Sequence, residues 1–330
     1  MVQKILFIPL IISFLATLIA TPFWIQRAKK VGLIGKDMHR LDKPEVAEVG
    51  GIPVLFGFIL GLLSYIALST FYFKNISRSL QIMSLLSAIL IIALMGLIDD
   101  ILGWKIGLRQ YQKPILTLLG ALPIIVINAG HSRMVLPFIG PIDFGLLYPL
   151  LLIPIGIVGA SNGFNMIGGY NGLESGLGII ILSALGFIAW QAGVAWIAVI
   201  SLAMVFALLA FYIFNKSPAK IFPGNMLTYS IGALIACIAI LANTEKAALI
   251  LFTPYFIEFF LKLRGLMQIE SFASLNPDGS LSLPEKKLYG IEHLAILILS
   301  KIKTKVTELN VVFSLYFLEI ILAIIVILVK

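Results

Sequence analysis

Asp99 and Asp100 form a pair of adjacent carboxylates directly after an apolar run over residues 79–98. Two such neighbours repel each other, are costly to remove from water and shift each other's pKa. A plain helix end would favour cations here, because the helix dipole is negative at its C-terminus. One interpretation is a polar helix end in contact with water. The second is that one carboxylate binds a divalent metal ion or acts as a base, and the unfavourable helix dipole makes this second interpretation the better one. Lys113, at the start of the next apolar run, is by itself typical of an interfacial anchor.

A second stretch, residues 161–174, lacks Lys and Arg but contains three Asn and four Gly residues. Glycine lets a backbone approach a ligand closely, and an Asn side chain both donates and accepts hydrogen bonds. These properties suit a uracil edge, a sugar or a metal ion. Because uncommitted polar groups at membrane depth are expensive, binding explains this loop better than a run of turns and caps does.

Two more stretches combine glycine with polar or aromatic residues. In residues 215–225, Gly224 and Asn225 begin an apolar run whose first backbone N–H groups favour an anion, and Phe222 can stack on a nucleobase. A merely capped helix start explains this loop equally well. The first loop carries Lys36 and Asp37 after a glycine, and later Glu48 before two glycines.

The elements that position these loops are apolar. The chain of 330 residues is 60% hydrophobic and 12% charged, against about 45–50% and about 25% in soluble domains. A membrane span needs about 20 apolar residues, and ten runs qualify, although those at 114–128 and 146–160 are short. The sequence therefore predicts an all-α polytopic membrane protein whose single domain covers residues 1–330. Its ten expected spans are 3–23, 52–73, 79–98, 114–128, 146–160, 176–193, 194–213, 225–242, 246–263 and 310–329.

Charge and cysteine content exclude several other classes. The net charge of +8 resides in short loops between the apolar runs, which is typical of membrane orientation and not of nucleic-acid binding. The single cysteine, Cys237, allows no intrachain disulfide, and three scattered histidines make no zinc cluster. The first run is long and ends in basic residues, so we interpret it as a retained span and not as a signal peptide.

Most of the Lys and Arg residues follow odd-numbered runs, so the positive-inside rule places both termini outside and the loops described above in the cytoplasm. The longest inside segment, 264–309, has a tight-turn sequence at 276–279 and then apolar residues at helical spacing, between 288 and 302. An amphipathic helix on the inner membrane surface and a helix packed against the bundle are equally good interpretations.

Taken together, these loops resemble the polyprenyl-phosphate N-acetylhexosamine-1-phosphate transferase family. The resemblance runs from Gly35 to about Pro254. It rests on the Asp99–Asp100 pair, on Asn-x-x-Asn…Gly-x-Asn-Gly-Leu-Glu over 162–174, and on Asn-x-x-Pro-Ala-x-x-Phe-x-Gly over 215–224. The segments 35–38 and 48–50 make the chain most similar to the dolichyl-phosphate N-acetylglucosamine-1-phosphate branch of archaea and eukaryotes.

The resemblance implies a role for each matching residue. Asp99 and Asp100 would be the acidic pair near the acceptor phosphate, and Lys113 would contact the diphosphate. Asn165 would lie at a Mg²⁺ site, for which Mn²⁺ is an alternative ion, and Asn225 replaces the family's usual metal-binding Asp. The nucleotide and sugar pocket would contain Lys36, Asp37, Met38, Glu48, Asn162, Gly169, Asn171, Glu174 and Phe222, with Phe222 packed against uracil.

One departure concerns the last inside loop, which lacks the histidine-rich motifs of the family. Arg264 and His293 are only weak substitutes for them. The implied partners are a UDP-sugar, a polyprenyl or dolichyl phosphate and the bilayer, with no nucleic acid, and a homodimer is compatible. The implied location is the plasma membrane of an archaeon or the endoplasmic reticulum of a eukaryote.

The implied reaction is transfer of N-acetylglucosamine 1-phosphate to the lipid phosphate with release of UMP, which begins lipid-linked oligosaccharide assembly. Two rivals stay open. One is a related enzyme that uses another UDP-N-acetylhexosamine for cell-wall or surface polysaccharide. The other is a transporter or flippase for lipid-linked sugars, although such proteins often carry polar groups at mid-membrane in repeated halves.

Overall fold

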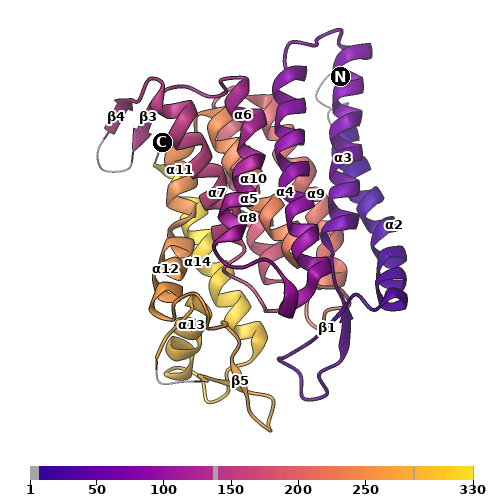
Figure 1. Cartoon of the computed structure of the whole chain (residues 1–330), viewed down its shortest axis with the longest axis vertical. Coiled ribbons are helices and arrows are strands. Elements are labelled where there is room, and N and C mark those ends of the chain that lie inside the picture. Colours follow the sequence, from indigo (N-terminus) through magenta and orange to yellow (C-terminus); the bar gives the residue numbers. More distant parts are fainter. Residues whose placement is uncertain (1–6, 137–139, 285–286, 330) are drawn as a thin grey trace.

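The computed structural model describes residues 7–136, 140–284 and 287–329, and the fold is a bundle of helices (Figure 1). Residues 1–6 and Lys286, which enter the predicted first span and the charge pattern, lie outside the described residues. Within the described part, seven helices are long and apolar enough to cross a membrane. They are α2 (Phe7–Val31), α3 (Gly51–Ala67) with its π-helical continuation Leu68–Tyr72, α4 (Ser79–Ile106), α8 (Leu173–Gln191), α9 (Ala195–Asn215), α10 (Gly224–Ala242) and α14 (Glu308–Leu328).

The other three predicted spans are also helical but shorter or interrupted. Residues 114–128 fold as α5 (Gln112–Thr117), a 3₁₀ turn (Leu118–Ala121) and α6 (Leu122–Val126). Residues 146–160 fold as a π-helical turn (Tyr148–Leu152) followed by α7 (Ile153–Phe164). Residues 246–263 break at Phe252 into α11 (Glu245–Leu251) and α12 (Thr253–Arg264), because Pro254 cannot supply a backbone donor.

Helix α10 lies at the centre of the bundle. Of its most apolar 18 residues, 83% are buried, against 28% for those of α2 at the periphery. Helix α10 packs against α3, α4, α7, α8 and α9. Small residues in α10 allow this close packing: a Cβ at Gly232 would come within 2.2 Å of the Ala160 carbonyl oxygen. The central helix therefore connects the helices whose ends carry the candidate site residues.

Helix α4 does not end at residue 98. It continues to Ile106 with a break at Gly103, whose φ is +72°, so Asp99 and Asp100 lie one turn before that break. The sequence-based boundary was wrong because the two acidic residues, which stop the apolar run, find partners on other elements and leave the helix intact.

Three two-stranded ladders extend from the ends of the bundle. They are β1 (Ile34–Lys36) with β2 (Glu45–Ala47), β3 (Arg133–Leu136) with β4 (Gly140–Asp143), and β5 (Ser274–Leu275) with β6 (Leu281–Ser282). The turn predicted at 276–279 joins β5 and β6, with Gly279 N–H donating to the Asn276 carbonyl. Figure 1 shows β1 and β5 at one end of the bundle and β3–β4 at the other.

Helix α13 (Ile291–Ser300) occupies the second half of segment 264–309. It packs against α12 and α14 and buries Glu292, His293, Ala295 and Ile296 among its residues, as the packing interpretation expected. Ile298 and Ile302 are exposed, and contact of these residues with the inner membrane surface stays a prediction.

Candidate functional site

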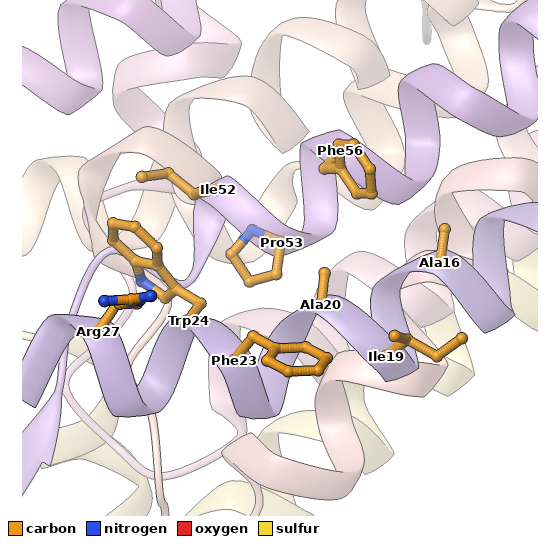
Figure 2. Close-up of a pocket in the computed structure, with 9 residues that line it drawn as sticks. All are labelled: Ala16, Ile19, Ala20, Phe23, Trp24, Arg27, Ile52, Pro53 and Phe56. Atoms are coloured by element: carbon orange, nitrogen blue, oxygen red, sulfur yellow. The ribbon is translucent and has the colours of Figure 1, made fainter.

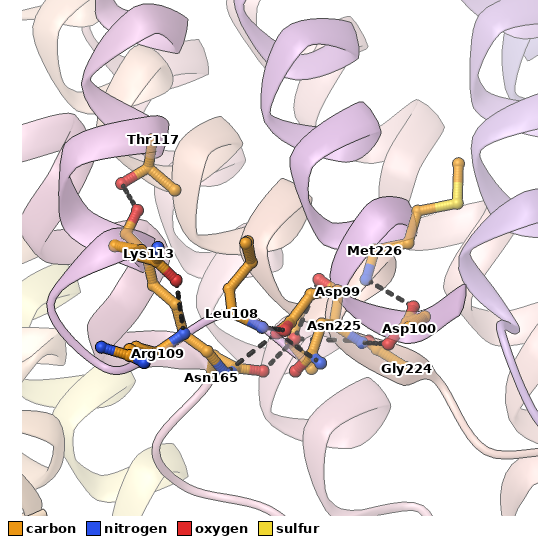
Figure 3. Close-up of polar contacts among 12 residues, drawn as sticks. Asp99, Asp100, Leu108, Arg109, Lys113, Thr117, Asn165, Gly224, Asn225 and Met226 are labelled. Atoms are coloured by element: carbon orange, nitrogen blue, oxygen red, sulfur yellow. Dashed lines mark hydrogen bonds and ion pairs between the residues drawn. The ribbon is translucent and has the colours of Figure 1, made fainter. Parts of the chain in front are cut away.

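Asp99 is the centre of a polar cluster near the end of α4 (Figure 3). Its Oδ2 accepts hydrogen bonds from the Nζ of Lys113 at 2.9 Å and from the side-chain amide of Asn225 at 2.9 Å. Its Oδ1 accepts the backbone N–H of Leu108 at 2.8 Å. The side chain of Asp99 is buried, so these donors replace the water that a buried carboxylate loses.

Asp100 lies beside it and binds the N-terminus of α10. The backbone N–H groups of Asn225 and Met226 donate to its two carboxylate oxygens at 2.7 and 3.0 Å. Gly224 permits this approach, because its φ is +72° and a Cβ there would lie 2.6 Å from an Asp100 oxygen. The anion at the start of α10 is a side chain of the same protein, and binding of a ligand anion there stays a prediction.

Asn165 ends α7 beside this cluster, and its side-chain oxygen accepts a hydrogen bond from the hydroxyl of Thr228 in α10. Asn162, one turn earlier, donates its amide to the hydroxyl of Thr117 at 2.9 Å and to the carbonyl of Val158. Because Thr117 lies one turn after Lys113 on α5, the Asn162 contact fixes the helix that presents the lysine to Asp99.

The donor atoms of this cluster fit a hard divalent cation. The carboxylates of Asp99 and Asp100 lie beside Asn225 where α4 nears its end and α10 begins, and Asn165 ends α7 nearby; Mg²⁺ prefers oxygen ligands such as these, and an ion bound here would replace donors that the two carboxylates now accept. The Asn225 amide nitrogen already donates to Asp99, so its oxygen is the atom left to face an ion. Lys113 neutralises part of the negative charge, which suits a site where phosphate groups also approach.

A second polar cluster joins the first loop, the glycine-rich loop and α14. Asn171 bridges Asp37 and Glu308: its side-chain amide donates to Asp37 at 2.8 Å and to Glu308 at 3.1 Å. His39 lies 3.4 Å from Glu308 and stacks on Tyr170 with ring centroids 4.2 Å apart. Asp37 and Asn171 were predicted from the sequence, whereas His39 and Glu308 were missed.

Two buried carboxylates hold the backbone of the glycine-rich loop. Glu174 accepts the N–H of Gly169 at 3.0 Å, and Glu292 of α13 accepts the N–H of Gly168 at 3.1 Å. Burial and the neighbouring Glu258 raise the pKa of Glu292 well above its usual value. Gly169 has a φ of +86° and would strike Phe272 with a Cβ, so the loop needs glycine there.

Backbone hydrogen bonds join the segment around Glu48 to the segment around Phe222. The Phe222 N–H donates to Ala47, and the N–H groups of Gly50 and Gly51 donate to Phe222 and Pro223. Burial raises the pKa of Glu48, whose carboxyl packs against Gly35. The remaining predicted residues, Lys36 at the end of β1 and Met38 just after it, are exposed.

An apolar groove lies elsewhere on the bundle. It measures about 570 Å³ and lies between α2 and α3 (Figure 2). Its lining is apolar apart from Arg27, as Figure 2 shows with Phe23, Trp24 and Phe56. A groove without carboxylates or amides offers little to a sugar nucleotide, so we place the chemistry at the Asp99 cluster.

Comparison with known sequences shows which proteins this chain resembles. Residues 82–243, which span the Asp99 cluster, match glycosyl transferase family 4. A protein of Saccharolobus solfataricus, provisionally named UDP-N-acetylglucosamine–dolichyl-phosphate N-acetylglucosaminephosphotransferase, is 40% identical over 296 residues, or 88% of this chain and 87% of its own length. A protein of Sulfolobus acidocaldarius with the same provisional name is 34% identical over 95% and 93% of the two chains. The phospho-N-acetylmuramoyl-pentapeptide-transferase of Halalkalibacterium halodurans is 32% identical over 82% and 85%.

Proposed function

The chain belongs to glycosyl transferase family 4, and we propose that it transfers N-acetylglucosamine 1-phosphate from UDP-N-acetylglucosamine to dolichyl phosphate, with release of UMP. The observation that carries the proposal is the cluster of Asp99, Asp100, Lys113, Asn165 and Asn225 at one end of a bundle of membrane-length helices. Two relatives that share most of their length with this chain have names that describe the same reaction.

The chemistry requires positioning and charge neutralisation more than covalent participation by the protein. The lipid phosphate attacks the β-phosphorus of the UDP-sugar, and UMP leaves. Lys113 adds positive charge where the diphosphate becomes more negative, and a carboxylate of the Asp99–Asp100 pair removes a residual proton from the lipid phosphate. Mg²⁺, held by oxygens of Asp99, Asp100, Asn165 and Asn225, would neutralise diphosphate charge when bound.

We further propose the ten-span arrangement with both termini outside and the Asp99 cluster facing the cytoplasm. Within the described residues, seven of the ten predicted segments are membrane-length helices and three are shorter or interrupted helices, and the loops with most of the basic residues adjoin the candidate site. UDP-sugars are cytoplasmic substrates in this scheme. The membrane is the plasma membrane of an archaeon or the endoplasmic reticulum of a eukaryote.

One alternative keeps the chemistry and changes the substrates. The name of the relative from Halalkalibacterium halodurans describes transfer of a phospho-N-acetylmuramoyl-pentapeptide, so a UDP-linked N-acetylhexosamine other than N-acetylglucosamine is the second candidate donor. A transporter or flippase is less compatible with a polar cluster in which Asp99 is held by Lys113 and Asn225 at a helix end.

The test is UMP release by the purified full chain in detergent or nanodiscs, with UDP-N-acetylglucosamine and dolichyl phosphate. Asp99→Asn keeps the size of the side chain and removes its charge, and we expect kcat to fall at least about 100-fold, as for a lost general base or electrostatic stabiliser. Glu270→Gln is the matched control, because Glu270 is an exposed acidic residue of the last inside loop. A near wild-type rate for Asp99→Asn contradicts the site, and no UMP release by the wild type contradicts the function.

A further inference from the structure

Glu308, the first residue of α14, contacts three separate segments with one carboxylate. Its Oε1 accepts the backbone N–H of Asn171 at 2.7 Å and lies 3.4 Å from His39 Nδ1. Its Oε2 accepts the Asn171 amide at 3.1 Å and the hydroxyl of Ser217 at 3.1 Å. The partners lie in the first loop, the glycine-rich loop and the loop before α10, so this carboxylate fixes the relative positions of all three.

Asp37 completes the arrangement from the opposite side of Asn171. The Asn171 amide nitrogen donates to Asp37 Oδ2 at 2.8 Å as well as to Glu308, so both of its hydrogens are used. Only the amide oxygen of Asn171 is left to face a ligand. Asn171 therefore offers a nucleotide or sugar an acceptor, and never a donor, while the three loops keep this arrangement.

The same residues form a hydrogen-bonded joint between loops. Ligand atoms of Asp37, His39 and Glu308 lie within 4.8 Å of one another. Asp37 Oδ1 accepts the backbone N–H of His39, and both Glu308 oxygens accept hydrogen bonds from Asn171 and Ser217.

The loop that Glu308 holds is also the loop expected to bind substrate. One residue after Asn171, Gly172 takes a φ of +84° and begins α8, and its carbonyl accepts the hydroxyl of Tyr316 from α14 at 2.6 Å. Helix α14 thus holds two successive residues of the loop through Glu308 and Tyr316. We propose that Glu308 is a positioning residue that keeps the glycine-rich loop in the arrangement that binds the nucleotide sugar, an inference that rests on the proposed function.

Two measurements on Glu308→Gln test this inference with the full chain. Gln places an amide N–H₂ group against the donors of Asn171 or Ser217. Hydrogen exchange of the backbone N–H groups of residues 168–174, including that of Asn171, should therefore become at least about tenfold faster. The KM for UDP-N-acetylglucosamine should rise at least about tenfold while kcat stays within about threefold, because a displaced loop weakens binding and leaves the Asp99 cluster in place. Glu270→Gln should change neither quantity.

The outcomes separate this inference from the proposed function. Unchanged hydrogen exchange in Glu308→Gln overturns the positioning role, and so does a kcat that falls with an unchanged KM. If the wild type releases no UMP, the proposed function falls, and the exchange measurement still decides whether Glu308 holds the loop. Should Glu308→Gln fail to fold, Ser217→Ala removes a single donor, and faster exchange in 168–174 or 216–218 with a raised KM is then the expected result. Wild-type values in Ser217→Ala overturn the inference.

Discussion

Asn225 stands between the two carboxylates of α4, with its backbone N–H on Asp100 and its side-chain amide on Asp99. An amide stabilises this arrangement because it donates to a buried carboxylate. The family that the sequence resembles usually has an aspartate at this position. The geometry explains how an amide fits, since its nitrogen binds Asp99 and its oxygen is left for a cation.

The substitution Asn225→Asp should therefore make the protein dependent on metal for stability. Without Mg²⁺, a third carboxylate repels Asp99 and lowers the thermal midpoint, and Mg²⁺ raises that midpoint more than it does in the wild type. The measurement is thermal unfolding in detergent with chelator and with millimolar Mg²⁺. Asn128→Asp, the same change in an exposed turn at the far end, should show no such difference. An equal Mg²⁺ response in Asn225→Asp and the wild type would place the metal elsewhere.

Glu292 predicts a pH dependence of stability. One of its oxygens accepts Gly168 N–H and the other is buried with no described partner, near Glu258 and Ser271. Lys262 contacts Glu258 at 3.7 Å and is the facing cation. Since the folded-state pKa of Glu292 is raised, its favourable contribution is present below the unfolded pKa and is lost as pH rises towards the folded pKa.

Glu292→Gln keeps an acceptor for Gly168 and removes that titration. We expect the variant to match the wild type in thermal midpoint near pH 4 and to exceed it by a few degrees near pH 8. Unfolding is followed at both pH values, with Glu270→Gln as the exposed control. A difference that is the same at both pH values would show that Glu292 does not carry this dependence.

At the scale of elements, the start of α10 depends on a glycine. Gly224 has a left-handed φ, and a Cβ at this position would strike the carboxylate of Asp100. Gly193, in the turn between α8 and α9, has a similar φ of +79° and open space around it. A side chain other than glycine would strain the backbone equally at the two positions. Only at Gly224 would it also strike a carboxylate, that of Asp100.

Gly224→Ala and Gly193→Ala should both cost about 1–2 kcal/mol of stability through strain. Only Gly224→Ala displaces Asp100, so we expect its kcat for UMP release to fall at least about tenfold while Gly193→Ala keeps nearly wild-type kcat. Equal kcat values in the two variants would argue that the contact between Asp100 and α10 is unimportant for turnover.

The elements also show what the sequence could predict. Within the described residues, seven of the ten apolar runs are membrane-length helices and three are shorter or interrupted helices, because hydrophobic runs are a local property of the chain. The end of α4 was misplaced because Asp99 and Asp100 find a partner in Asn225, more than 120 residues along the chain. Glu308 was missed for the same reason, since its partners lie more than 90 residues away. Its acidic side chain directly before the last apolar run was the available signal.

At the scale of the whole molecule, the position of the loops relative to the membrane decides the function. Ser77→Cys and Lys220→Cys, in a Cys237→Ala background, place one exposed thiol on each proposed side. Ser77→Cys should react with an impermeant thiol reagent in intact cells, and Lys220→Cys only after permeabilisation, since the positive-inside rule places residue 220 in the cytoplasm. The reverse pattern would put the Asp99 cluster away from cytoplasmic UDP-sugars.

Main-chain hydrogen bonds join residues 47–51 to residues 221–223, and this affects which segments of the protein can be replaced by those of a relative. These three hydrogen bonds use main-chain atoms alone, so they impose no side-chain identity beyond the close approach at Gly50 and Gly51. Chimeras that replace one of these two segments with the matching segment of a relative should therefore assemble without a compensating change in the other. Such segments can diverge independently between lineages.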